Sequence, residues 1–467
     1  MTDWQGKNVT VAGLGVSGIP AAKALHGLGA NVTVVNDGDD ARAREQAAGL
    51  EALGVTVRLG DGATLPEGAE LVVTAPGWKP DKPLFMAARA AGVPIWGDVE
   101  LAWRLRGPDA APWLCVTGTN GKTTTTRMLA SILEAAGLRT AAVGNIGVSL
   151  LDAVLGDERY DVLAVELSSY QLHWAPSLRA HSAAVLNLAP DHLDWHGSME
   201  AYAKDKGRVY EGNRVACVYN VADKATEDLV READVEEGCR AIGFTLGAPA
   251  PSQLGVVDGI LVDRAFVEDR QKNAQELAEV ADVDPPAPHN IANALAAAAL
   301  ARAFGVPPKA VRDGLRAFVP DAHRIAHVAD VDGVAYVDDS KATNTHAAQA
   351  SLAAYGSIVW IAGGLAKGAT FDELVAESAE RLRGVVLIGA DRALIREALA
   401  RHAPEVPVVD LDRTDTGAMS AAVQEARRLA AEGDTVLLAP ACASMDMFVN
   451  YNQRGDAFAQ AVRELGT

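Results

Sequence analysis

The chain has 467 residues, of which 49% are hydrophobic and 5% aromatic, a composition that suits two or three packed α/β domains and excludes a disordered chain. Its net charge of −19 argues against a nucleic-acid or anionic-membrane partner. No apolar run approaches the ~20 residues of a membrane span, the N-terminus lacks the layout of a signal peptide, and the four cysteines have no metal-ligand spacing. We therefore expect a cytoplasmic enzyme without membrane insertion.

The first elements follow the pattern of a nucleotide-binding α/β fold. Residues 9–12 predict a short buried strand, which runs into Gly-Leu-Gly-Val-Ser-Gly at 13–18 and an Ala-rich helix over about 19–28. A second predicted strand, 32–35, ends at Asn36 and Asp37, where a dinucleotide fold binds a ribose. On this pattern alone, NAD binding and plain tight packing by the glycines both remain open.

A third predicted strand and a linker complete this first part. Residues 71–75 form the strand, which leads into Pro76-Gly77-Trp78 at the edge of the sheet where ligands collect. The Gly- and Pro-rich stretch 107–112 is typical of a linker.

The strongest motif is a phosphate loop within residues 113–137. Four apolar residues predict a strand, the stretch Gly118-Thr119-Asn120-Gly121 follows, and a helix begins near Lys122 and is closed by Gly137. Small residues let backbone N–H groups approach phosphate oxygens, and a helix N-terminus adds partial positive charge. Lys122 would contact terminal phosphates and the Thr123 hydroxyl would bind Mg²⁺. The loop is shortened, because Val116 stands where the usual P-loop has its first glycine.

Polar residues follow two further predicted strands of this middle part. Residues 161–165 end at Glu166, whose carboxylate is well placed to bind Mg²⁺ beside a phosphate loop. Residues 183–188 lead into Pro190-Asp191-His192-Leu193-Asp194, a candidate metal or substrate cluster. The bland alternatives are a solvated loop glutamate and a surface histidine. Lys206 lies in a helical pattern and is, by pattern alone, only a lysine. His289 and Asn290 stand at the start of a predicted helix. They could cap the helix or contact a base or ribose, and the sequence leaves both open.

Four apolar segments in the last third predict a second open α/β sheet. They are residues 334–337, 358–362, 385–388 and 435–439. Polar clusters stand at the ends of three of these strands, where ligands gather in such folds. Several α/β units with one phosphate loop favour an enzyme that joins two anionic substrates at the expense of ATP over a simple dehydrogenase.

Together these motifs resemble the Mur ligase family, essentially end to end. GTNGKTTT at 118–125 marks the wider ligase superfamily, which includes folylpolyglutamate synthase. The narrower signature is GNIG at 144–147, ELSSYQL at 166–172, PDHLDWHG at 190–197 and HNIANALAA at 289–297. The stretches that resemble the D-glutamate-adding branch are DDSKATN at 338–344, GGLAKG at 363–368 and APACASMD at 439–446.

The resemblance implies an α/β fold of three domains and a ligase activity. The domains would be a Rossmann-like UDP-substrate-binding domain (1–110), a central P-loop ATP-binding domain (111–319) and a Rossmann-like C-terminal domain that contacts ATP and the amino acid (320–467). The enzyme would use ATP and Mg²⁺ to add D-glutamate to UDP-N-acetylmuramoyl-L-alanine through an acyl phosphate, as a monomer in cytoplasmic peptidoglycan precursor synthesis. The first domain would then bind uridine diphosphate rather than NAD.

The resemblance also implies a role for individual residues. The catalytic residues would be Lys122, Asn145, Glu166, His192 and Lys206. The ATP contacts would be Gly118, Thr119, Asn120, Gly121, Lys122, Thr123, Thr124, Asn293, Arg324 and Asp339. The UDP-substrate contacts would be Leu14, Gly15, Val16, Asp37, Gly77, Asn145 and His192. The D-glutamate contacts would be Lys341, Thr343, Lys367, Ser444 and Tyr451. The metal ligands would be Thr123, Glu166, His192 and a carbamylated Lys206.

The sequence departs from the family pattern at one point, and three other functions compete with this interpretation. Asp37 is followed by Gly38-Asp39-Asp40, without the basic residue that relatives carry nearby, which leaves the uracil contact open. The competing functions are an NAD-dependent oxidoreductase, a non-catalytic nucleotide or UDP-sugar sensor, and a sibling ligase for another amino acid.

Overall fold

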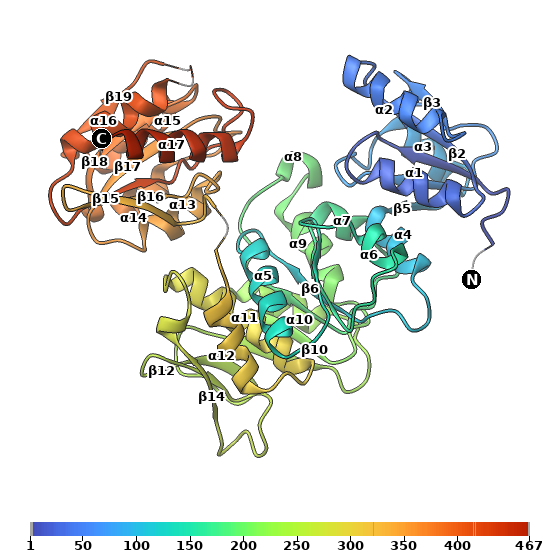
Figure 1. The fold of residues 1–467 in the computed structure, drawn as a ribbon, viewed down its shortest axis with the longest axis horizontal. Helices are drawn as coiled ribbons and strands as arrows, with labels where there is room; N and C mark the ends of the chain where they lie inside the picture. Colours follow the sequence, from blue (N-terminus) through green and yellow to red (C-terminus); the bar gives the residue numbers. More distant parts are fainter. Residues whose placement is uncertain (1–2, 321, 414, 416, 466–467) are drawn as a thin grey trace. The chain divides into compact units, whose positions relative to one another are not determined.

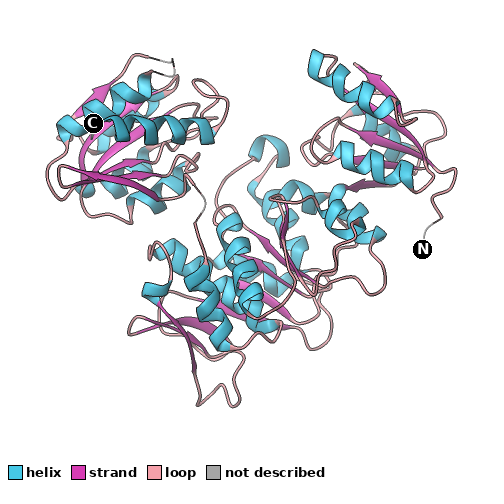
Figure 2. Cartoon of the chain, viewed as in Figure 1, coloured by secondary structure: helices cyan, strands magenta, loops and turns pink. Residues whose placement is uncertain are grey.

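The computed structural model describes residues 3–320, 322–413, 415 and 417–465. The chain forms two compact units, one of residues 1–283 with 291–318 and one of residues 284–290 with 319–467. The described residues form three sheets of mainly parallel strands, and helices connect most of the successive parallel strands (Figures 1 and 2). The α/β class predicted from the sequence is therefore confirmed.

The first sheet is wholly parallel, and its central strand is the one before the glycine-rich turn. The strand order is β3-β2-β1-β4-β5. The strands are β1 (Asn8–Ala12), β2 (Asn31–Asn36), β3 (Thr56–Leu59), β4 (Leu71–Thr74) and β5 (Ile95–Gly97), and the helices are α1 (Gly18–Gly27), α2 (Ala41–Glu51), α3 (Pro83–Ala90) and α4 (Asp98–Leu105). From β1 the chain continues to β2 and β3 on one side of the sheet, and then to β4 and β5 on the other side. The loops after β1, β2 and β4 therefore meet at one edge of the sheet.

The second sheet has nine strands in the order β14-β13-β12-β11-β10-β9-β6-β8-β7. Its parallel strands are β6 (Trp113–Thr117), β7 (Ala142–Gly144), β8 (Leu163–Glu166), β9 (Ser182–Val185), β10 (Ala216–Asn220), β11 (Arg240–Phe244) and β12 (Gln253–Val257). An antiparallel extension, β13 (Ile260–Asp263) and β14 (Gln275–Glu279), has no counterpart among the predicted strands. The phosphate-loop strand β6 is buried throughout and lies between β8 and β9.

Helices cover both faces of this second sheet. They are α5 (Lys122–Ala135), α6 (Leu150–Leu155), α7 (Ser169–His173), α8 (Leu193–His196), α9 (Met199–Gly207), α10 (Lys224–Glu232), α11 (Pro288–Ala303) and α12 (Pro308–Ala317), with short 3₁₀ turns η1 (Arg208–Tyr210) and η2 (Val280–Asp282). Alternate residues of β6 face opposite ways, as a strand requires. Leu114 and Val116 pack with α5, α11 and α12, whereas Trp113 and Cys115 belong to the core on the other face.

The third sheet has the order β15-β16-β20-β17-β18-β19, in which only β15 is antiparallel. Its strands are β15 (Ala326–Val331), β16 (Val334–Asp338), β17 (Ile358–Gly363), β18 (Leu382–Ile388), β19 (Val408–Asp410) and β20 (Thr435–Leu438). Its helices are α13 (Thr345–Leu352), α14 (Asp372–Ser378), α15 (Arg392–His402), α16 (Ala418–Leu429) and α17 (Tyr451–Leu465), with η3 (Ala379–Arg381) after α14. One face packs on α13, α14 and α15, and the other on α16 and α17. Among the described helices, none is long and apolar enough to cross a membrane.

Candidate active site

The phosphate loop joins β6 to α5 through two glycines with positive φ. Gly118 has φ 153° and Gly121, the residue before α5, has φ 82°, so the chain turns sharply before the helix starts at Lys122. A Cβ atom on Gly121 would lie 2.4 Å from Oδ1 of Asn293, one of the predicted ATP contacts. Asn120 and Asn187 hold the loop reciprocally, with the Asn120 N–H donating to Oδ1 of Asn187 at 2.8 Å. The loop is thus rigidly placed beside α11.

Two lysines meet at one carbonyl oxygen of this loop. Nζ of Lys122 donates to the carbonyl oxygens of Gly118 at 2.9 Å and Thr119 at 2.8 Å, and Nζ of Lys206 donates to Gly118 at 2.8 Å. Lys206 is 1% exposed. Burial, aided by the charge of Lys122, holds the pKa of Lys206 well below its ordinary value, against the opposing charges of Asp191 and Glu166. A deprotonated amine at this place is a nucleophile.

A buried carboxylate stands beside the loop. Glu166, at the end of β8, is 1% exposed, and its Oε1 accepts a hydrogen bond from Nδ2 of Asn145 at 2.8 Å. Its Oε2 is buried and has no hydrogen-bond partner among the described residues. An unpaired buried carboxylate oxygen is costly unless a cation meets it. Predicted catalytic residues Asn145 and Glu166 are therefore in direct contact.

These residues fit a Mg²⁺ ion held partly by phosphate. Mg²⁺ prefers oxygen ligands and is usually held by one or two carboxylates together with substrate phosphates. The orphaned Oε2 of Glu166 supplies such an oxygen, and Thr123 lies in the first turn of α5. Within the part of the chain that the structure describes, no three His, Cys, Asp or Glu residues cluster in a metal-binding group, so an all-protein metal cage is not among its features.

His192 lies just before α8 in a left-handed conformation, with φ 54°. Its Nε2 is 3.4 Å from a carboxylate oxygen of Asp191, and its ring packs on Tyr170 with centroids 4.9 Å apart. The side chain is 45% exposed; desolvation of its covered part is the main cause that lowers the pKa of His192, and the nearby charges of Lys122 and Lys206 add to it, while Asp191 opposes it. The ring therefore favours the neutral form, which is the form that binds a metal ion.

Sequence reasoning missed the polar cluster next to Lys206. Asp205 accepts hydrogen bonds from Nδ1 of His173 at 2.9 Å and Nδ1 of His196 at 3.0 Å, and it pairs with Nε of Arg208 at 3.1 Å. Burial acts to raise the pKa of Asp205, but the hydrogen bonds from the two histidines and the charge of Arg208 lower it to about 2. The sequence signal that could have indicated this cluster was His196, which belongs to the same motif as His192.

Five of the seven predicted UDP-substrate residues lie on loops of the first sheet, whereas Asn145 and His192 belong to the middle part of the chain. Leu14 is buried and its N–H donates to Oδ1 of Asn36 at 3.1 Å, whereas Val16 is 88% exposed. Gly15 follows Leu14 in the same turn. The turn needs glycine at its end, because a Cβ on Gly18 would lie 1.9 Å from the carbonyl oxygen of Gly13.

The cation that the sequence near Asp37 lacks comes from elsewhere in the chain. Nζ of Lys82 forms a hydrogen-bonded ion pair with Asp37 and lies 4.4 Å from the ring centroid of Trp78. The exposed Gly77 precedes that tryptophan, and its carbonyl oxygen accepts the indole N–H of Trp195 at 3.2 Å. Asp37 therefore has a basic neighbour that local sequence could not reveal.

In the second unit, the three predicted strand-end clusters are joined by backbone hydrogen bonds. The N–H of Ala441 donates to Ala342 at 2.9 Å, and Leu365 and Ala443 exchange N–H···O bonds of 2.9 Å in both directions. Thr343, Lys367 and Ser444 belong to these loops, Ser444 being buried and Lys367 exposed with φ 50°. Nζ of Lys341 lies 4.0 Å from the ring centroid of Tyr451. The predicted D-glutamate residues thus come from loops that contact one another.

A buried arginine that sequence reasoning missed ties the first and last of these clusters together. Arg454 is 1% exposed; it donates to the side chain and carbonyl of Ser340 at 2.9 and 2.7 Å and to the carbonyl of Cys442 at 3.0 Å. Nearby, burial outweighs the Ser351 hydrogen bond and the charge of Arg324 and raises the pKa of Asp339 to about 6. Arg324 and Asp339, both predicted ATP contacts, therefore interact electrostatically.

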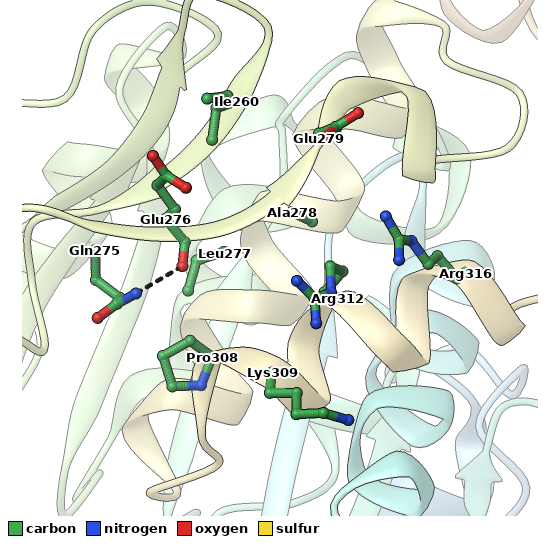
Figure 3. A pocket seen from close by; sticks show the side chains of 10 residues that line it. All are labelled: Ile260, Gln275, Glu276, Leu277, Ala278, Glu279, Pro308, Lys309, Arg312 and Arg316. Carbon is green, nitrogen blue, oxygen red and sulfur yellow. Dashed lines mark hydrogen bonds between the residues drawn. The ribbon is translucent and has the colours of Figure 1, made fainter.

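A cavity of about 360 Å³ is lined by none of the predicted site residues (Figure 3). It is bounded by β14, Ile260 of β13 and the basic side chains of α12. Those basic residues are Lys309, Arg312 and Arg316, of which Lys309 pairs with Asp313 and Arg316 with Asp282. Two of these three cations are paired within the fold, and we assign the cavity no role in the chemistry.

Comparison with known proteins extends these observations. The fold and the phosphate loop define a nucleotide-binding α/β protein of several sheets. The Mur ligase middle domain matches residues 116–301, and the Mur ligase, glutamate ligase domain matches residues 323–442. A UDP-N-acetylmuramoylalanine–D-glutamate ligase of Streptomyces avermitilis is 89% identical over 100% of both chains, and one of Thermobifida fusca is 60% identical over 99% of both. The chain belongs to the Mur ligase family, as the resemblance predicted.

Solved structures share the fold at low sequence identity. The MurF ligase from Thermotoga maritima in complex with ADP has a TM-score of 0.59 and 16% identity, covering 98% of this chain and 96% of that one. A pseudomurein peptide ligase type C from Methanothermus fervidus has a TM-score of 0.58 and 17% identity, covering 98% and 100%. These likenesses support the fold of several α/β sheets.

Proposed function

We propose that this chain is an ATP-dependent, ADP-forming ligase that joins D-glutamate to UDP-N-acetylmuramoyl-L-alanine in peptidoglycan precursor synthesis. The observation that carries the proposal is the full-length likeness, at 89% identity, to a ligase of that name. The alternative of an NAD-dependent oxidoreductase, based on the glycine-rich turn alone, is disfavoured by the same likeness. The hydrogen bond between Asn145 and Glu166, which lies on the strand next to the phosphate-loop strand, supports the ligase chemistry.

The reaction has two steps that this site can serve. The alanine carboxylate attacks the γ-phosphorus of ATP, the bond to the β-phosphate oxygen breaks, and an acyl phosphate and ADP result. The amine of D-glutamate then attacks the acyl carbon, phosphate leaves, and the amine proton is released. A carboxylate and a triphosphate repel each other, so cations must offset their charges. Lys122 and the N-terminus of α5 supply positive charge at the phosphates.

We assign two Mg²⁺ ions to four residues that come from four segments around the middle sheet. Thr123 and Glu166 would hold one Mg²⁺ at the phosphates, and His192 with Lys206 would hold a second. When bound, Mg²⁺ neutralises phosphate charge and polarises the phosphoryl group. Lys206 is placed for carbamylation because its buried amine favours the neutral, nucleophilic form. The added carbamate turns this cation into an oxygen donor. Asn145 hydrogen-bonds Glu166 and so holds its carboxylate in place.

The remaining assignments concern the two substrates. Lys341 and Thr343 would bind one carboxylate of D-glutamate and Lys367 the other, with Ser444 and Tyr451 closing the pocket, because a dicarboxylate needs cationic partners. Leu14, Gly15, Val16, Asp37 and Gly77 would bind the UDP end, and Asn293, Arg324 and Asp339 the base, phosphate and ribose of ATP. We also propose three domains (1–110, 111–319 and 320–467) and a monomer that acts in the cytoplasm.

The test is phosphate release from ATP and Mg²⁺ with UDP-N-acetylmuramoyl-L-alanine. D-glutamate is compared with L-glutamate, L-lysine, meso-diaminopimelate and no amino acid. Release that requires both the nucleotide substrate and D-glutamate supports the proposal. Lys122→Ala, which removes the phosphate-contacting cation, is the control for background ATPase. Release that is highest with another amino acid would instead identify a sibling ligase. Enhanced NADH fluorescence without ATP turnover would refute the ligase assignment.

A further inference from the structure

The carboxylate of Asp205 is the meeting point of three short helical segments. His173 comes from α7, His196 from α8 and Arg208 from the start of η1, and all three bind Asp205 of α9 at 2.9–3.1 Å. Asp205 is 6% exposed, and the side chain of His196 is fully buried. A buried carboxylate is costly unless its oxygens are bound, and here both oxygens are. The cluster is therefore built to hold the three segments together.

One proposed metal ligand lies just before α7, one just before α8 and one within α9. Glu166 ends the strand that leads into α7, His192 directly precedes α8, and Lys206 follows Asp205 in α9. In the part of the chain that the structure describes, no side-chain hydrogen bond joins any two of these three proposed ligands. Glu166 is fixed by the pairing of β8 with β6 and β7, and the places of His192 and Lys206 relative to it depend on how α7, α8 and α9 are held together. Asp205 belongs to α9, its carboxylate binds residues of α7 and α8, and it is not itself a proposed ligand.

The hydrogen bonds extend from Asp205 through His196 to α7. Because an ionised carboxylate only accepts hydrogen bonds, Nδ1 of His196 must carry the proton that faces Asp205. In the neutral ring Nε2 is then an acceptor, and the hydroxyl of Ser169 donates to it at 2.9 Å. The His196 ring also stacks on Tyr170, with centroids 5.5 Å apart and an interplanar angle of 2°. One histidine therefore locks α7 to α9 in a defined orientation.

The order Ser169, His196, Asp205 matches the hydrogen-bond pattern of a nucleophilic triad, but burial excludes that use. Ser169 is 2% exposed and the side chain of His196 has no exposure, so no substrate carbonyl can reach the hydroxyl. A chain of polar groups closed off from solvent holds structure in place. The remaining role is positioning.

We propose that Asp205 is a positioning residue, which ties α7, α8 and α9 together and thereby sets the relative places of Glu166, His192 and Lys206. This inference rests on the proposed function, since those three residues are proposed as its metal ligands. Partners that orient metal ligands affect metal affinity or activity by about 10- to 100-fold when they are removed. Asp205→Asn keeps the size of the side chain, but an amide cannot accept from both histidines and Arg208 at once.

The experiment compares Asp205→Asn with a matched buried carboxylate of the same unit. Asp263 is fully buried and accepts from Nε of Arg302 at 2.9 Å and from two backbone N–H groups, and none of these partners is a site residue. Mn²⁺ affinity is measured by electron paramagnetic resonance on the whole enzyme with ADP, without turnover. The carbamate of Lys206 is followed by NMR after carbon-13 bicarbonate labelling. Phosphate release gives kcat and KM.

We expect Asp205→Asn to lower Mn²⁺ affinity and kcat by about 10- to 100-fold and to reduce the carbamate signal, with KM for D-glutamate within about twofold of wild type. Asp263→Asn should lose thermal stability but keep its Mn²⁺ affinity. Ser169→Ala, which removes only the hydrogen bond to His196, should give a smaller loss of the same kind and serves if Asp205→Asn does not fold. Wild-type Mn²⁺ affinity in both folded Asp205→Asn and Ser169→Ala, or an equal loss in Asp263→Asn, would overturn the inference. Failure of the ligase proposal is read separately, from the wild-type enzyme's lack of D-glutamate-dependent phosphate release.

Discussion

The packing of α12 on α5 leads to a prediction about Gly314. This glycine lies within α12, and a Cβ atom there would be 2.4 Å from Cα and 2.7 Å from N of Ile132 in α5. Its carbonyl oxygen also accepts the hydroxyl of Ser131 at 2.7 Å. Because the obstructing atoms belong to the backbone, Gly314→Ala can be accommodated only if the two helices move apart.

The magnitude follows from three opposing contributions. Alanine gains about 1 kcal/mol of helix propensity over glycine. Overpacking costs about 1–3 kcal/mol, here at the upper end because helices must shift, and loss of the Ser131 hydrogen bond costs about 1 kcal/mol. The net loss is about 2–3 kcal/mol, which lowers Tm by roughly 4–12 °C for a domain of this size.

The assay is thermal unfolding by calorimetry, with Gly49→Ala as the control. Gly49 also lies within a helix, α2, but a Cβ there has nothing within 4 Å, so alanine should raise stability by up to about 1 kcal/mol. Since α5 begins at the phosphate loop, Gly314→Ala should also weaken ADP binding. A Tm for Gly314→Ala at or above that of wild type would refute the packing argument.

Three further predictions concern single side chains. Glu166→Gln should lower kcat by about 100-fold or more without lowering Tm, because the charge stabilisation that a metal ion supplies is worth several kcal/mol. An unchanged kcat at saturating Mg²⁺ would contradict the assignment of Glu166 as a metal ligand. Lys367→Ala should raise KM for D-glutamate by about 10- to 100-fold, which corresponds to the loss of a hydrogen bond to a charged group, and should change KM for ATP less than twofold. Equal effects on both KM values would show that Lys367 does not bind D-glutamate. The raised pKa of Asp339, about 6 in the fold, means that the folded state binds the proton more tightly, so stability falls as pH rises from about 4 to 6. This fall in the free energy of unfolding is worth up to about 3 kcal/mol, and Asp339→Asn should abolish it in denaturation curves measured at the two pH values. A fall of equal size in the variant would show that other groups cause it.

The parts of the site that could be predicted from the sequence are those whose position follows from the order of neighbouring strands, loops and helices along the chain. In a parallel sheet the carboxyl ends of strands meet at one edge, so a polar cluster after each apolar run predicts a shared site. The places of Gly121, Lys122 and Glu166 were predictable in this way, because the first two stand in the short loop and helix start after β6 and Glu166 ends β8. The loops around Lys341 and Ser444 were also expected to meet, and backbone hydrogen bonds join them.

The parts that could not be predicted depend on contacts between distant segments. Asp37 and Lys82 are 45 residues apart, and no local pattern indicates that the lysine turns back to this aspartate. Arg454 has an ordinary place in a helix, and only the fold buries it between two loops. Asp205 has the neighbour Lys206 in sequence, yet its partners come from two other helices. Burial and pairing of such charges are properties of the tertiary fold.

The outermost strand of the nine-stranded sheet has a consequence for solubility. β14 is an edge strand, and an unprotected edge can recruit a strand from a second chain and begin aggregation. Here the strand is only five residues long, Glu276 and Glu279 are exposed on it, and the basic side chains of α12 line the cavity beside it. A strand from another molecule that paired with β14 would have to strip water from these charges. The charged border therefore opposes the recruitment of a further strand at this edge of the sheet.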